Sequence, residues 1–301
     1  MNRPFLKVIS PGLGAAFQDQ GRPGWRRFGV PSGGAMDRHA ASFANRLLAN
    51  PPWAAVIECL LLGARFLVLR DCWLALTGAD MLTSHPRWRA FFAREGETIQ
   101  MPGHSAGVWA YLAIEGGFAA PHWLDSTSTL ASAGLGVPLQ KGELIYRGET
   151  EARFELPPGV AGRLAPWSEQ RSYNHPPPLR VWPAPQWDWF TPDELNRFFE
   201  QSWVVAPQSN RIGYRLHGQP LTAPERPMVS EPVRVGSIQI PPSGQPVVIL
   251  RDGPTVGGYP KIGIVDPADV DWLVQTAPGR SFQFTKANPE LPANSVNHEI
   301  H

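Results

Sequence analysis

The sequence has almost no charge imbalance and no long uninterrupted apolar run. Lys and Arg number 27 against 26 Asp and Glu, a formal net charge of +1. Such a chain has no general attraction for a phosphate backbone or an anionic membrane. The most apolar stretch, residues 56–76, carries Glu58, Arg65, Arg70 and Asp71, which would be costly to bury in a bilayer. We therefore expect neither a nucleic-acid partner nor a membrane partner.

Cysteine is scarce, and no leader segment is evident. Cys59 and Cys72 lie in apolar surroundings without CxxC or histidine spacing, which predicts buried, reduced thiols rather than a disulfide framework or a zinc site. Pro4 and Pro11 interrupt the N-terminal residues before any apolar run long enough for a signal peptide. We expect a cytoplasmic protein.

The chain lacks the sequence signatures of several enzyme classes. It contains no GxSxG elbow, no HExxH pair and no GxGxxG that follows a strand and opens a helix. Residues 253–261 differ from a phosphate-binding P-loop because Tyr259 and Pro260 separate Gly258 from Lys261. The histidines lie in unrelated loops without ligand spacing. We expect no self-contained ATP loop and no metal motif in this chain.

Proline and glycine, by contrast, are abundant. The 33 Pro and 29 Gly leave little room for long helices, and an apolar fraction of 43% excludes intrinsic disorder. Short apolar runs bounded by these residues predict strands, so we expect a mainly β fold of closed or nearly closed barrels with a few short helices. The expected strands span 66–69, 73–77, 108–114, 203–206, 233–240, 247–250 and 281–285.

Three segments predict helices. Residues 37–50 place their apolar side chains on one face and stop at Pro51. Residues 191–201 open with Thr191 as the cap and Glu194 to complete a capping box. Residues 266–277 open in a similar way and end before Pro278.

The chain length of 301 residues is typical of one large domain or of two domains, and a proline-rich stretch in the middle favours two. We expect an N-terminal region over 1–165 and a C-terminal region over 186–288. The proline-rich residues 166–185 would form a semi-rigid connector, and the tail 289–301 has no packing pattern and is expected to be flexible.

The first polar, glycine-rich segment, residues 18–37, leads directly into an expected helix. Its glycines would let backbone amides approach a ligand, and the helix N-terminus favours an anion. Asp19, Arg22 and Asp37 are its candidate functional residues. In the alternative interpretation, Asp37 is only the helix cap, and Asp19 and Arg22 form an ion pair that stabilises the loop.

Two later segments also carry candidates. In residues 209–218, Arg211 and Arg215 would point to the same side if the run is extended, and could hold a carboxylate or phosphate. The alternative is a solvent-facing strand. In residues 230–261, a carboxylate, hydroxyl groups and an ammonium group could orient a small polar substrate; the residues are Asp252, Thr255, Tyr259 and Lys261.

Five short motifs occur in a specific order along the chain. They are QDQGR at 18–22, GAMD at 34–37, RIGYRL at 211–216, GSIQ at 236–239 and GGYPK at 257–261. Together they resemble the family variously called allophanate hydrolase subunit 2, KipA-type proteins, the biotin-dependent carboxyltransferase-like domain and the C subunit of 5-oxoprolinase. The resemblance covers nearly the whole chain.

The resemblance implies two cyclophilin-like β barrels in tandem. It also implies a hydrolase complex with KipI-type and LamB/YcsF-type subunits, which opens the lactam ring of the small-molecule substrate 5-oxo-L-proline to give L-glutamate. ATP would be shared with, or bound by, a partner chain, and the isolated chain is expected to be inactive. Because no carrier region is attached, biotin is not expected. Two alternatives stay open: a non-catalytic regulatory binding protein of the KipA type, and a component that transfers a carboxyl group from biotin to urea.

Under this resemblance, Asp19 and Asp252 would handle protons or position the substrate, and Lys261 would stabilise developing negative charge. Arg211 and Arg215 would clamp a carboxylate or phosphate. The remaining candidates for substrate binding are Arg22, Asp37, Gln239, Thr255 and Tyr259.

Overall fold

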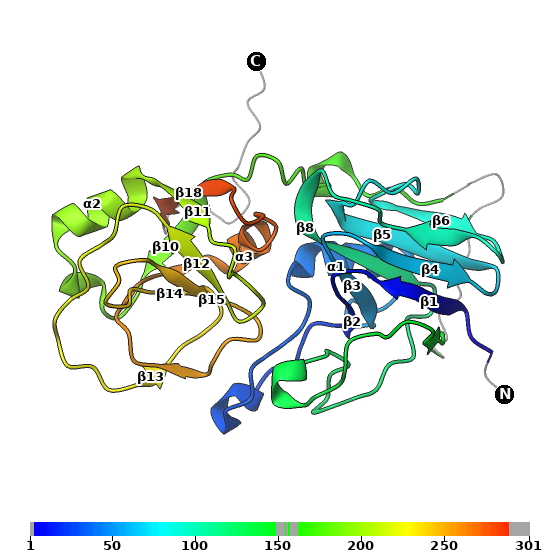
Figure 1. Cartoon of the computed structure of the whole chain (residues 1–301), viewed down its shortest axis with the longest axis horizontal. Coiled ribbons are helices and arrows are strands. Elements are labelled where there is room, and N and C mark those ends of the chain that lie inside the picture. The colour runs from blue at the N-terminus through cyan, green and yellow to red at the C-terminus, as the bar shows by residue number, and fades with distance from the viewer. Residues whose placement is uncertain (1–2, 149–153, 155, 157–161, 289–301) are drawn as a thin grey trace, which may run out of the picture. The chain divides into compact units, whose positions relative to one another are not determined.

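The computed structural model describes residues 3–148, 154, 156 and 162–288. The chain divides into two compact units (Figure 1). Unit 1 comprises Met1–His175, Arg251–Thr255 and Val274–Ala277, and unit 2 comprises Pro176–Leu250, Val256–Leu273 and Pro278–His301. The C-terminal part of the chain thus contributes to both units. The tail 289–301, expected to be flexible, lies outside the described residues.

The expected fold class, mainly β with a few short helices, is confirmed. Unit 1 contains a four-stranded sheet in the order β7-β4-β1-β9 and a five-stranded sheet in the order β2-β3-β8-β5-β6. Its strands are β1 (Leu6–Pro11), β2 (Ala15–Gln18), β3 (Val56–Leu60), β4 (Ala64–Val68), β5 (Cys72–Asp80), β6 (Arg89–Ala93), β7 (Thr98–Gln100), β8 (Ala106–Ile114) and β9 (Leu144–Ile145). Its helices are α1 (Arg38–Leu47) and the 3-10 turns η1 (Trp25–Phe28), η2 (Ala131–Ala133) and η3 (Trp167–Glu169).

The two sheets of unit 1 share one hydrophobic core. Leu6 of β1 and Phe66 of β4 pack in the same buried cluster as Leu74 of β5 and Leu112 of β8. Cys59 and Cys72 are also buried in this cluster as free thiols, and burial raises the pKa of Cys72 to about 12. The interpretation of both cysteines as buried, reduced thiols is confirmed.

Helix α1 packs on the five-stranded sheet and starts where the sequence predicts. The carboxylate of Asp37 caps it by accepting a hydrogen bond from Ala40 N at 2.9 Å. The helix ends at Leu47, a few residues before the expected end, and Asn50 then bonds to the carbonyl of Ile114 at 2.8 Å. The C-terminal end of α1 is therefore anchored to the buried strand β8.

Unit 2 is a closed barrel in the order β10-β17-β14-β15-β12-β11-β18. The parallel pairing of β10 with β18 closes it, and a separate two-stranded sheet joins β13 to β16. Its strands are β10 (Leu179–Pro183), β11 (Ser202–Val205), β12 (Gly213–His217), β13 (Glu231–Pro232), β14 (Ser237–Gln239), β15 (Val247–Ile249), β16 (Val256–Gly257), β17 (Lys261–Val265) and β18 (Ser281–Lys286). Its helices are α2 (Pro192–Glu200), α3 (Pro267–Leu273) and the 3-10 turn η4 (Trp187–Trp189).

Helix α2 forms as predicted, with half of the expected capping box. Thr191 accepts a hydrogen bond from Glu194 N at 3.3 Å. The Glu194 carboxylate instead accepts hydrogen bonds from the backbone and hydroxyl of Thr222, at 3.1 and 3.0 Å. Glu194 thereby ties a loop to the helix rather than completing the box.

Two sequence predictions in unit 2 need correction. The single strand expected over 233–240 is interrupted, because Gly236 has a φ of 90° and Ser237 N donates to Arg234 O in a turn. The helix expected over 266–277 stops at Leu273. Residues 274–277 belong to unit 1, where the Gln275 side chain bonds to the backbone of β8. None of the helices in the described residues is long and apolar enough to cross a membrane.

Trp203 of β11 is one of the large side chains that fill the core of the barrel in unit 2. It is fully buried, its ring lies 5.9 Å from that of Phe198, and its indole N–H donates to Phe198 O at 2.9 Å. Trp203→Ala is expected to lower the free energy of unfolding of unit 2 by about 3–5 kcal/mol, because it leaves a large cavity. Calorimetric unfolding should show a change of less than about 1 kcal/mol for Val204→Ala at the exposed neighbouring position. Equal effects of the two substitutions would contradict this account.

Candidate functional site

Two polar clusters hold most of the predicted site residues. The loop cluster of unit 1 comprises residues 19–34, 126–128 and 251–255. The lysine cluster of unit 2 comprises Gln186, Glu231, Gln239, Gly257 and Lys261. Each cluster joins segments that are far apart in the sequence, and each is described within its own unit.

Asp19 is the best-connected side chain of the loop cluster. One carboxylate oxygen accepts hydrogen bonds from Gly21 N and Ser126 Oγ, both at 2.7 Å. The other accepts from Thr127 N at 2.7 Å and from Thr127 Oγ1 at 3.1 Å. Because four donors already converge on it, this carboxylate is fully engaged in holding residues 126–127 against the first polar segment. The geometry favours a positioning role for Asp19.

Arg22 is buried in the same cluster. Its Nε donates to Trp123 O at 3.3 Å and its Nη2 donates to Ser128 O. Its Nη1 is buried without a hydrogen-bond partner among the described residues. Burial lowers the pKa of Arg22, while the charges of Asp19 and Asp252 act in the opposite direction. Arg22 thus fixes the 123–128 loop through backbone carbonyls.

Residues 251–255 meet the first polar segment although more than 200 positions separate them. Gly33 N donates to Arg251 O at 2.9 Å, and Arg26 Nη2 donates to Pro254 O at 2.8 Å. The structure therefore brings Asp252 and the half-buried Thr255 into the cluster that holds Asp19 and Arg22.

Asp37 belongs to a different, fully buried network. Besides capping α1, it accepts hydrogen bonds from Tyr173 Oη at 2.7 Å and from Gln275 Nε2 at 2.9 Å. Its backbone N–H donates to Tyr111 Oη, which in turn donates to the Glu58 carboxylate at 2.8 Å. These contacts support the alternative interpretation of Asp37 as a structural residue, and its role in substrate binding stays a prediction.

The lysine cluster is built on two neighbouring barrel strands and the small β13-β16 sheet. Gln239 of β14 faces Lys261 of β17 in the strand register, which places both side chains on the same face. Lys261 is 4% exposed, and its ammonium group bonds to the Glu231 carboxylate and, at 3.3 Å, to Pro232 O. Gln186 Nε2 donates to the same Glu231 oxygen at 2.9 Å. The hydrogen bonds from Lys261 and Gln186 lower the pKa of Glu231, and partial burial opposes them.

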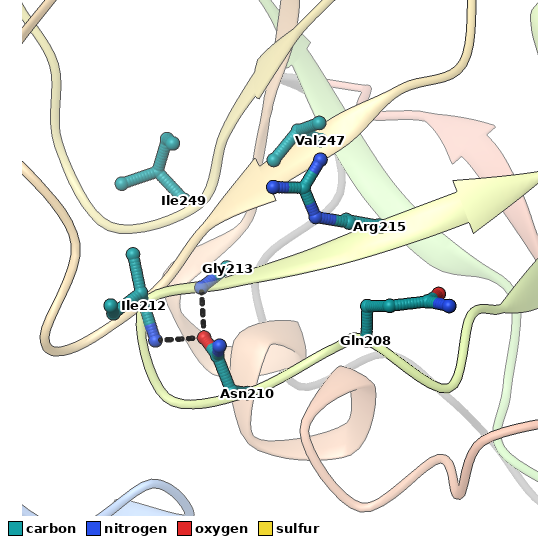
Figure 2. A pocket seen from close by; sticks show the side chains of 7 residues that line it. All are labelled: Gln208, Asn210, Ile212, Gly213, Arg215, Val247 and Ile249. Carbon is teal, nitrogen blue, oxygen red and sulfur yellow. Dashed lines mark hydrogen bonds between the residues drawn. The ribbon is translucent and has the colours of Figure 1, made fainter.

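Arg215 lines a separate pocket of about 530 Å³ in unit 2 (Figure 2). Figure 2 shows its guanidinium group extending from β12 beside Val247, with Asn210 at the far end of the pocket. Asn210 Oδ1 accepts hydrogen bonds from the backbone of Ile212 and Gly213, at 2.8 and 3.4 Å. Arg211 lies in a bend before β12. The alternation of side-chain direction along an extended strand therefore does not fix Arg211 on the same side as Arg215. Anion binding by this pair stays a prediction.

The sequence analysis did not identify Gln186 and Glu231 as functional candidates. It also did not identify Ser126 and Thr127 as hydrogen-bond donors to Asp19. Glu231 carries a signal that could have been used, because it lies in the same glycine-rich segment as Lys261. Gln186 directly follows the expected connector and has no such signal. Tyr259, two residues before Lys261 in the sequence, is 48% exposed.

The described residues contain no group of three or more His, Cys, Asp or Glu side chains that could hold a metal ion. They do contain cationic side chains within these sites: the buried Arg22 in unit 1, and Arg215 and the buried Lys261 in unit 2. Such groups can bind carboxylates or phosphates and can stabilise negative charge that develops during a reaction.

The fold and its clusters define a mainly β protein of two units, each with a polar cluster that joins distant segments of the chain. Residues 28–286 match the family model described as "Carboxyltransferase domain, subdomain A and B". The chain therefore belongs to this carboxyltransferase domain family, and the resemblance inferred from its motifs is confirmed.

Three comparisons show what the chain is similar to. It is 32% identical to the C subunit of the Escherichia coli 5-oxoprolinase, over 95% of this chain and 92% of that protein. The crystal structure of TTHA0988 matches with a TM-score of 0.82 and 31% identity, over 94% of this chain and 56% of that one. The Kluyveromyces lactis urea amidolyase matches with a TM-score of 0.85 and 26% identity, over 96% of this chain and 19% of that one. The chain thus spans only part of these two solved proteins.

The four hydrogen bonds to Asp19 predict a large cost for a nearly isosteric substitution. Asp19→Asn removes the charge and turns an NH2 group toward donors, so we expect unit 1 to lose about 2–4 kcal/mol of unfolding free energy. Asp125→Asn, at an exposed position in the adjoining loop, should change it by less than about 0.5 kcal/mol. Calorimetry and limited proteolysis of the 123–128 loop measure both effects. An Asp19→Asn protein as stable and as protease-resistant as the parent would contradict the positioning role.

Tyr111 predicts a specific pH dependence of stability. Burial raises its pKa well above the usual value, and Glu58 and Asp37 contribute in the same direction. The folded state keeps the phenol protonated, whereas the unfolded chain releases the proton above about pH 10. The stability that Tyr111 contributes is therefore complete below that pH and is lost as pH rises further. The stability advantage of the parent over Tyr111→Phe should shrink by about 1.4 kcal/mol between pH 8 and pH 11 in urea titrations. A constant difference would show that the phenol ionises normally in the fold.

Proposed function

We propose that this chain is the C subunit of an ATP-dependent 5-oxoprolinase that converts 5-oxo-L-proline to L-glutamate. The observation that carries the proposal is its 32% identity to the E. coli C subunit over nearly the full length of both chains. The urea amidolyase, by contrast, matches over only 19% of its own length. The name of the relative as one subunit of an enzyme supports a heteromeric complex. We propose KipI-type and LamB/YcsF-type subunits as the partners, with the isolated chain inactive.

The chemistry fits the side chains that the structure presents. A five-membered lactam is a poor electrophile because its amide is stabilised by resonance. Transfer of the terminal phosphoryl group of ATP to the amide oxygen would release ADP and activate the carbon toward water. Cleavage of the C–N bond and hydrolysis of the phosphorylated product would then give L-glutamate and inorganic phosphate. In this proposal Lys261 stabilises negative charge, Asp252 handles a proton or positions the substrate, and Asp19 and Arg22 hold the loop that carries Asp252.

ATP is assigned to a partner chain, or to a site shared with it. In this chain the segment most similar to a phosphate loop continues into strands β16 and β17 instead of opening a helix. It therefore lacks the helix N-terminus that cradles phosphates in P-loop proteins. Arg211 and Arg215 are the side chains of unit 2 that we propose for contact with a phosphate or carboxylate.

Transfer of a carboxyl group to urea is the second candidate function. The family description and the similarity to the solved urea amidolyase favour it, with a biotin carrier supplied in trans. Incorporation of labelled bicarbonate into urea in the presence of a biotinylated carrier would support this candidate. A purely regulatory binding role predicts turnover of neither substrate.

Reconstitution tests the proposed function. Co-expression with the KipI-type and LamB/YcsF-type subunits should give ATP-dependent release of glutamate from 5-oxo-L-proline, and omission of this chain should abolish it. Replacing both Arg211 and Lys261 with alanine should lower kcat/KM by at least about 100-fold, because two charged contacts are lost. Lys141→Met, at an exposed position of unit 1, is the matched control and should leave turnover unchanged. Full ATP-coupled turnover by the double variant would exclude the assigned roles.

A further inference from the structure

In the lysine cluster, the Glu231 carboxylate accepts hydrogen bonds from two side chains, and a third side-chain donor has no acceptor. Lys261 Nζ and Gln186 Nε2 both donate to one oxygen of Glu231. Gln239 Nε2, which faces Lys261 across the strands, is buried and has no hydrogen-bond partner in the described part of the chain. A buried amide N–H without an acceptor costs free energy that a ligand could recover.

The carboxylate that occupies this cluster is not part of the barrel. Glu231 lies in the two-residue strand β13, whose pairing partner is the equally short β16. The Lys261 side chain is 5% exposed, whereas that of Glu231 is 33% exposed. The donors therefore come from the closed barrel and its adjoining turn, and the acceptor comes from a small sheet outside the strand order of the barrel. Such a sheet has few backbone hydrogen bonds to hold it in place.

Gly257 of β16 closes the cluster on the same side. A Cβ at this position would collide with Gln239 Nε2 and would approach Val233 at 3.1 Å. The β13-β16 sheet therefore lies directly on the unpaired amide. Moving this sheet away would uncover Gln239 and release Glu231 from Lys261 in a single step.

We propose that Lys261, Gln186 and Gln239 form a binding site for the carboxylate of a small molecule, and that Glu231 occupies this site in the free chain. A ligand carboxylate would place one oxygen near Lys261 Nζ and Gln186 Nε2, as Glu231 does, and its second oxygen would reach the unpaired Gln239 amide. The β13-β16 sheet would open for the ligand to enter. The carboxylate class follows from the geometry, and the choice of 5-oxo-L-proline as the ligand rests on the proposed function. The proposal refines the role of Lys261, which would hold the substrate carboxylate rather than charge that develops on the lactam, and it leaves Arg215 for a phosphate.

Binding to the isolated full-length chain tests this inference without any turnover. Isothermal titration calorimetry compares 5-oxo-L-proline with 2-pyrrolidone, the same lactam without its carboxylate. We expect 2-pyrrolidone to bind at least about tenfold more weakly, since it lacks the charge-assisted hydrogen bonds. Lys261→Met should weaken binding of 5-oxo-L-proline by at least about tenfold, and Gln239→Leu by about three- to tenfold. Lys141→Met is the control and should bind like the parent.

Glu231→Gln gives the most specific readout. It keeps the size of the side chain but removes the charge that competes for Lys261, so 5-oxo-L-proline should bind at least about threefold more tightly. A variant that merely damaged the fold would bind more weakly, and Glu231 is exposed enough to be replaced without unfolding the barrel. Tighter binding by Glu231→Gln together with loss in Lys261→Met would support the proposal.

Four outcomes would overturn it. They are equal binding of the two lactams, weaker binding by Glu231→Gln, binding that depends on Arg215 and not on Lys261, and absence of any carboxylate binding to the folded chain. Measuring both carboxylate binding and glutamate release in the reconstituted complex distinguishes failure of the proposed function from failure of this inference. Carboxylate binding without glutamate release would contradict the proposed function alone, and glutamate release without Lys261-dependent binding would contradict this inference alone.

Discussion

A buried charge needs partners, and the kind of partner determines what the charged group can still do. Asp19 has four donors, all from loops packed around it, and Asp37 is enclosed by a helix N-terminus, a tyrosine and a glutamine. The hydrogen-bond acceptors of these carboxylates are thus occupied by donors of the protein itself. Lys261 is equally buried, yet its anionic partner is Glu231, on a two-residue strand outside the barrel. The proposed exchange of the partner of Lys261 rests on this difference, because the Glu231 side chain is partly exposed.

Under the proposed function, this contrast separates the residues that hold loops in place from the residues assigned to the substrate. In unit 1, Asp19 and Arg22 bond to loops that carry other polar groups, and through Gly33 and Arg26 the same segment holds residues 251–255. The first polar segment therefore acts as a frame for Asp252 and Thr255. In unit 2 the barrel itself is the frame, because neighbouring strands fix the positions of Lys261 and Gln239. A barrel position is held by many backbone hydrogen bonds, which makes it suitable for placing a charge accurately.

Much of the fold could be predicted from the sequence, because its signals are local. Proline and glycine punctuation predicted a mainly β chain, and the caps at Asp37 and Thr191 predicted the starts of two helices. The errors arose at one distant contact and at one turn within an expected strand. Beyond the end of α3, Gln275 bonds to the backbone of β8, a contact that the local pattern does not reveal. The strand expected over 233–240 breaks at Gly236, which has a positive φ.

The candidate site was predicted less completely. Composition and motif order indicated Asp19, Lys261 and the other polar residues, but no sequence pattern could show that four donors saturate Asp19. The pairing of Lys261 with Glu231 and Gln186 depends on a strand register and on a turn, which spacing in the chain does not reveal. Burial and hydrogen-bond partners therefore had to come from the structure.

The account depends on whether a ligand carboxylate can replace the Glu231 carboxylate as the partner of Lys261. A crystal structure of the chain soaked with 5-oxo-L-proline tests this most directly. The account predicts the ligand carboxylate bonded to Lys261, Gln186 and Gln239, with the Glu231 side chain moved away. A ligand bound elsewhere, with the ion pair between Glu231 and Lys261 intact, would contradict it.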